Sequence, residues 1–197
     1  MAAINSVFSA RQIFRSSILL ILCCAFYLTW WLLAFKPSGA IKGMKSGWLL
    51  FPAFAAGLTS IILAVKGIQS APVHSTLFPD GSLLWGGITA YCVLAVVTRL
   101  CLKRPVTTEL FLIIGWAVLA SSEIDVLYGI GQLSYNWAVL FIIGAAAVTL
   151  AGLICYVLYN HLGKQAGYVD GTIPLLLVAL AAAGIAAVAQ IPRPLHF

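Results

Sequence analysis

Six long apolar runs constrain this chain more than any other feature of its sequence. Each run is close to the 20 or so residues that a helix needs to cross the hydrocarbon core of a bilayer. The runs are continuous rather than alternating, so they do not resemble barrel strands, and in lipid only a helix satisfies its own backbone. They cover residues 16–35, 48–65, 82–102, 107–128, 137–159 and 172–191. The sequence predicts an all-α, polytopic membrane protein, a compact bundle of six transmembrane helices.

Composition excludes the soluble classes. Of the 197 residues, 62% are hydrophobic and 8% are charged, against about 25% charged in an ordinary soluble domain. The net charge of +6 comes from basic residues that stand singly or in short groups between the spans. That distribution is typical of contact with lipid headgroups. We therefore expect a lipid bilayer and no nucleic acid as partner, and an integral protein of the cell inner membrane.

The domain organisation predicted from the sequence is simple. Residues 1–15 carry two arginines and no acid, and we interpret them as an amphipathic lead-in at the membrane interface. Residues 16–197 form a single six-helix domain, because the loops between the runs are short. Seven basic residues fall on one side of the membrane and four on the side that holds both termini. The positive-inside rule then favours termini on the extracytoplasmic side, although Arg11 and Arg15 beside the first span oppose this orientation.

Acidic residues inside a membrane span are candidates for function, because a charge at that depth is costly. Glu109, Trp116 and Glu123 follow one another at intervals of seven, so on a helix they form one stripe. Two interpretations stay open. The stripe faces a solute path, with Glu123 in an aqueous pocket between the third, fourth and sixth spans. Alternatively, both glutamates lie at the membrane surfaces and Trp116 is ordinary packing.

Four further residues complete the set of candidates for substrate binding or for lining a path. Asp125 points almost opposite to Glu123 on a helix, and Tyr128 ends the fourth span. Tyr168 and Asp170 concentrate polar groups at the entrance of the sixth span, where a helix N-terminus favours anions. A plain helix cap is the alternative interpretation of that segment.

We expect no metal, no cofactor and no catalytic residue. The five cysteines lie in or beside the apolar runs without the spacing of a metal site, and the three histidines fall in loops or the tail. Neither HExxH nor GxSxG occurs.

Three functions remain open, and transport of a small neutral or weakly acidic solute by a channel, carrier or substrate-capture subunit leads. The alternatives are a membrane enzyme acting on a lipid-soluble substrate and a non-catalytic subunit of a larger complex, so further copies or other membrane subunits are expected partners. In size and number of spans the chain is similar to small urea, amide and acetate channels and to vitamin-capture subunits of bacterial importers. No signature residue carries that similarity.

Overall fold

The computed structural model describes residues 2–34, 46–72, 77–100, 103, 108–158, 162 and 164–190. Every regular element in these ranges is helical. The elements are α1 (Ala2–Ala34), the 3-10 helix η1 (Ser46–Leu49), α2 (Leu50–Gln69), α3 (Ser82–Leu100), α4 (Thr108–Gly129), α5 (Tyr135–Leu158), α6 (Lys164–Asp170) and α7 (Ile173–Gln190). Six stretches within them are long and apolar enough to cross a membrane, the last combining α6 and α7. The predicted all-α bundle of six spans is confirmed.

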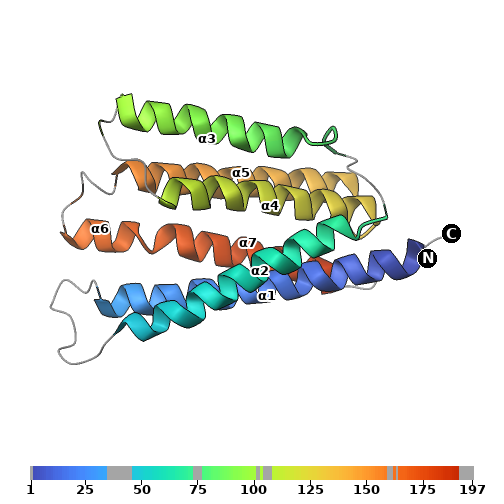
Figure 1. Ribbon diagram of the computed structural model, residues 1–197, viewed down its shortest axis with the longest axis horizontal. Helices are drawn as coiled ribbons and strands as arrows, with labels where there is room; N and C mark the ends of the chain where they lie inside the picture. The colour runs from blue at the N-terminus through green and yellow to red at the C-terminus, as the bar shows by residue number, and fades with distance from the viewer. Residues whose placement is uncertain are drawn as a thin grey trace.

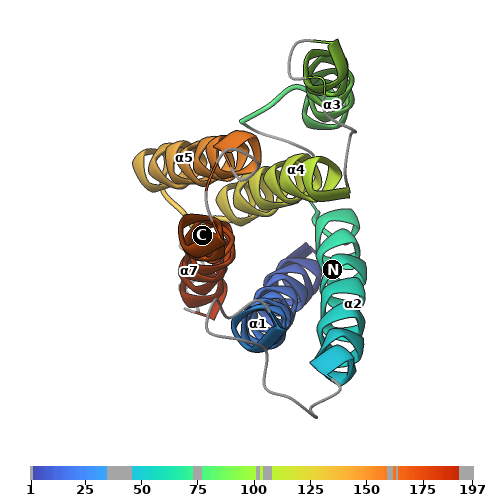
Figure 2. The same ribbon diagram turned by 90° about the vertical axis from the view of Figure 1, so that its left-hand side faces the viewer.

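The spans run alternately up and down, so α1 begins and α7 ends at the same end of the bundle (Figure 1). We call this the N-terminal end, and the other the far end. α1 packs chiefly against α2 and α7, and α4 packs against α5 and α3. The end-on view places α4 between α2 and α5, with α3 on the outside (Figure 2). The C-terminal half of α4 is therefore the centre of the bundle, and each residue from Glu123 to Leu127 is buried.

α1 is one unbroken helix that includes most of the segment expected as a separate lead-in. Ala10 and Ile13 belong to the main core cluster, with Ile124 and Leu127 of α4. The segment is therefore continuous with the first span, and one side of it, which includes Ala10 and Ile13, packs against other helices. Ile4, Val7 and Phe8 remain exposed on its outer side, where an apolar environment suits them.

α1 and α2 approach closely because the facing side of α2 is made of small residues. Ala53, Ser60, Ala64 and Gly67 are its buried positions. A Cβ at Gly67 would stand 3.0 Å from Cγ1 of Ile13, so glycine leaves the space that Ile13 fills. Small residues repeated along one face permit such close contact between membrane helices. This packing matters because the hydrophobic effect does not favour helix–helix contact over helix–lipid contact inside a bilayer.

The last span is interrupted between α6 and α7. Pro174 has no backbone N–H to donate one turn back, which weakens the helix at Asp170–Thr172. Gly171 packs directly against the ring of Trp31 from α1. The indole Nε1 of Trp31 donates to the carbonyl of Tyr168 at 3.0 Å. These contacts fix α6 to the far end of α1.

Candidate functional site

A buried hydrogen-bonded group of three side chains joins α1, α2 and α4. The hydroxyl of Ser16 donates to Oε1 of Glu123 at 3.2 Å. Ser60 Oγ lies 3.2 Å from Ser16 Oγ and donates to the Ser16 carbonyl at 2.9 Å. All three residues are buried, and Glu123 is only 6% exposed. We call Ser16, Ser60 and Glu123 the Glu123 site.

The Glu123 site lies within the spans rather than at their ends. At 1.5 Å per residue, Glu123 stands roughly 9 Å from the end of α4 and Ser60 roughly 14 Å from the end of α2. Ser16 stands roughly 18 Å from Ile4, where the first candidate span begins. A carboxyl group at this depth is costly unless it is hydrogen-bonded or neutralised, and this is why such residues mark function by default.

Asp125, two residues further on, has a different setting. Its Oδ1 accepts a hydrogen bond of 2.8 Å from the backbone N–H of Leu77, in the connection between α2 and α3. It is 5% exposed. As predicted, Asp125 and Glu123 point to different sides of α4, so their carboxyl groups contact different neighbours. Both are buried because α4 lies at the centre of the bundle. Asp125 anchors a loop, while Glu123 joins helices.

The remaining predicted site residues do not gather around Glu123. Glu109 is exposed in the first turn of α4, roughly 21 Å along the helix from Glu123. Trp116 is partly buried and packs against the main core cluster, as does Tyr128. Tyr128 also makes an edge contact with Tyr135, with 6.2 Å between ring centroids. Of the three residues in the predicted stripe, Trp116 and Glu123 therefore face the interior of the bundle, whereas Glu109 faces outward.

Tyr168 and Asp170 lie at the far end of the bundle. The Tyr168 hydroxyl donates to the carbonyl of Leu32 at 3.2 Å. Asp170 is buried next to the thiol of Cys155 on α5. His161, grouped with them in the sequence interpretation of an enzyme site, lies outside the described residues. Tyr168 therefore fastens α6 to α1, and Asp170 is buried against α5.

The hydroxyls of the Glu123 site and the polar residues near them are what sequence reasoning missed. Ser9, Gln12, Ser16 and Ser17 of α1 are all buried. Ser9 and Ser16 are seven residues apart with Gln12 between them, so the three share one side of the helix. That spacing of polar residues at the start of an apolar run is the signal from which they could have been found.

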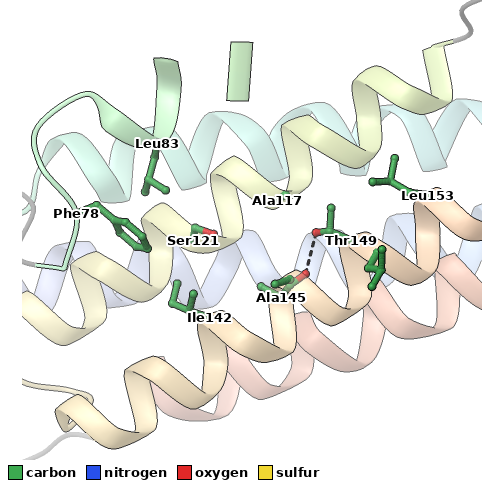
Figure 3. A pocket seen from close by; sticks show the side chains of 10 residues that line it. Phe78, Leu83, Ala117, Ser121, Ile142, Ala145, Thr149 and Leu153 are labelled. Atoms are coloured by element: carbon green, nitrogen blue, oxygen red, sulfur yellow. Dashed lines mark hydrogen bonds between the residues drawn. The ribbon is translucent and has the colours of Figure 1, made fainter. Parts of the chain in front are cut away.

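A shallow groove lies elsewhere, between α3, α4 and α5. It has a volume of about 380 Å³, and its lining includes Leu83, Ala117 and Leu153 (Figure 3). Two hydroxyls line it, those of Ser121 and Thr149, and the second donates to the carbonyl of Ala145 at 2.8 Å. None of the predicted site residues lines this groove.

No group of three or more metal-ligating side chains is found among the described residues. The comparisons with known proteins add no constraint: no family model, no curated protein and no solved structure matches the chain.

Proposed function

We propose that this multi-pass membrane protein transports a small neutral or weakly acidic solute, and that the Glu123 site is where the solute or its coupling partner binds. The observation that carries the proposal is the buried carboxyl of Glu123, held by a hydroxyl from another helix. A hydrogen-bonded carboxyl inside the spans costs stability, and a transporter is a setting in which that cost serves a purpose.

The location of the Glu123 site supports the same function. Ser16, Ser60 and Glu123 come from three different helices, so a small shift of α1 or α2 against α4 opens or closes the site. Sites at helix junctions inside the membrane are the arrangement by which transporters alternate access. The small side chains along the α1–α2 contact allow such a shift without a large change in packing.

A second candidate function is favoured by the groove between α3, α4 and α5. α3 has one buried residue, Thr98, and large exposed apolar side chains such as Trp85 and Leu100. A helix held by so few neighbours is what a subunit of a larger membrane complex presents to a partner. On that proposal the chain has no transport activity by itself.

Uptake into proteoliposomes tests the proposal. Vesicles containing the purified chain, and empty vesicles of the same lipid, are exposed to a panel of small neutral and weakly acidic solutes. We expect at least one solute to enter the protein-containing vesicles faster. Equal permeability across the panel would contradict autonomous transport and favour the subunit. The cell inner membrane is the location proposed for either function.

A further inference from the structure

We propose that the Glu123 site binds a monovalent cation, which reaches it from the N-terminal end of the bundle along a polar side of α1. The inference rests on the proposed function, because it names the ion that drives or accompanies the solute. Binding of this cation is measurable without any solute.

The first observation is that the Glu123 carboxyl has no positively charged partner nearby among the described residues. Within the described part of the chain, no basic side chain forms an ion pair with its carboxyl, whose contact is with the Ser16 hydroxyl. An ionised carboxylate without a countercharge at this depth is unfavourable, so the site takes up a positive charge from outside.

The neighbouring elements offer no other compensation. Arg11 and Arg15 of α1 and Lys66 of α2 are exposed, and Asp125 of α4 accepts from the backbone of Leu77. α7 contains no titratable residue. One carboxylate neutralises one positive charge, so the cation is monovalent.

The available ligand atoms define its chemistry. They are oxygens: the Glu123 carboxyl and the hydroxyls of Ser16 and Ser60. Oxygen ligands suit hard cations and hydrogen-bond donors rather than soft metals. A proton, an alkali cation and ammonium share this chemistry, and the experiment below separates them.

The approach to the site is the polar side of α1 formed by Ser9, Gln12 and Ser16. Ser9 Oγ and Gln12 Oε1 are buried without a hydrogen-bond partner among the described residues. Ser9 is fully buried and Gln12 is 8% exposed. Buried polar atoms in proteins nearly always have partners, so these two oxygens are suited to contact water or a passing cation.

On α2, the residue that faces Ser9 and Gln12 is a glycine, so no α2 side chain is inserted there. A Cβ at this residue, Gly67, would lie 3.3 Å from Cβ of Gln12 and 3.3 Å from the carbonyl oxygen of Ser9. A larger residue at this position would press against Gln12 and the Ser9 carbonyl. The polar side of α1 thus runs from Ser9, near the N-terminal end, roughly 10 Å inward to Ser16.

Thermal unfolding of the purified full chain tests the cation site. The melting temperature is measured in sodium, potassium and ammonium chloride against choline chloride at constant ionic strength, and across a pH series in choline. A ligand that binds only the folded state raises it by about 5–10 °C at roughly 100 times the dissociation constant. We expect one of these cations, or acidification alone, to do so.

Two site variants, Glu123→Gln and Ser60→Ala, and one control variant locate the effect. Glu123→Gln keeps the shape of the side chain and is expected to lose the stabilisation, while Glu109→Gln on the exposed end of α4 keeps it. Ser60→Ala is expected to weaken it, which tests the site even if Glu123→Gln folds poorly. Identical melting profiles for wild type and both site variants, or no response to any cation or to pH, overturn the proposal.

A labelling experiment tests the route of the cation along α1. It uses a chain whose native cysteines are replaced by alanine. A water-soluble thiol reagent should label Gln12→Cys faster than Ile13→Cys, its neighbour in the core, and the bound cation should slow that labelling. Equal rates overturn the path. Cation-dependent stabilisation without solute uptake contradicts only the proposed function, and uptake without stabilisation contradicts only the cation site.

Discussion

Ser16 and Glu123 are 107 positions apart in the sequence, yet the hydroxyl of one donates to the carboxyl of the other at 3.2 Å. The contact fixes the first span against the fourth, and Ser60 fixes the second span to the same point. One hydrogen-bonded group therefore holds the three helices that lie around the buried carboxyl.

The stability of this contact is the first prediction. Ser16→Ala removes a hydrogen bond between helices, and such bonds contribute about 0.6 kcal/mol on average in membranes and up to about 1.7. We expect the free energy of unfolding to fall by about 1 kcal/mol. Ser17→Ala is the matched control, because Ser17 Oγ is buried without a partner among the described residues. A loss at Ser17 as large as at Ser16 would show that the hydrogen bond is not the cause.

At Gly87 the contact between α3 and α4 leaves no room for a side chain. A Cβ at Gly87 would collide with Cγ2 of Val118, whereas a Cβ at the neighbouring Gly86 meets nothing within 4 Å. Gly87→Ala should lower stability by about 1–3 kcal/mol through overpacking. Gly86→Ala should be neutral or stabilising by up to about 1 kcal/mol, as alanine favours a helix. Comparable melting temperatures for the two variants would refute this packing.

Substitution of Asp125 should affect the stability of the protein but not its response to the cation, in contrast to substitution of Glu123. Asp125→Ala leaves the backbone N–H of Leu77 without its carboxylate partner, which costs about 1–3 kcal/mol. We expect lower stability, and an unchanged stabilisation by the cation. A variant that is stable but no longer responds to the cation would place Asp125 in the binding site.

Orientation is testable with cysteines at exposed positions near the two ends of α2, again in the chain without native cysteines. Pro72 follows α2 at the N-terminal end, and Gly47 precedes α2 at the far end. The excess of basic residues on the far side predicts labelling of Pro72→Cys by an impermeant reagent on intact cells, with Gly47→Cys protected. The reverse pattern would place the N-terminal end in the cytoplasm.

The spans themselves are predictable because hydrophobic length determines them. The expected fourth span, 107–128, differs from α4 by a single residue at each end, and its acids stand out as candidates. Helix α1 begins well before the apolar run that starts at residue 16, because the polar residues Ser9, Arg11 and Gln12 interrupt the hydrophobic pattern without ending the helix. In the bundle Ser9 and Gln12 face other helices, whereas Arg11 lies on the exposed side.

The partners of Glu123 are not predictable in the same way. The sequence predicts a path between the third, fourth and sixth spans, but the hydroxyls that bond with Glu123 come from the first and second. Helical periodicity shows which residues share a face of one helix, not which helix that face meets. The stripe also drifts about 20° per heptad, so Glu109 and Glu123 need not face the same neighbour.

The role of the buried carboxyl is tested most directly by comparing solute flux in proteins that differ at a single side chain. Wild type, Glu123→Gln and Glu109→Gln are reconstituted at equal density, and initial uptake of the solute found in the panel is compared. We predict that Glu123→Gln folds and inserts but loses flux by about tenfold or more, equivalent to at least about 1.4 kcal/mol, while Glu109→Gln retains it. Equal flux through wild type and Glu123→Gln would contradict a central role for the buried carboxyl.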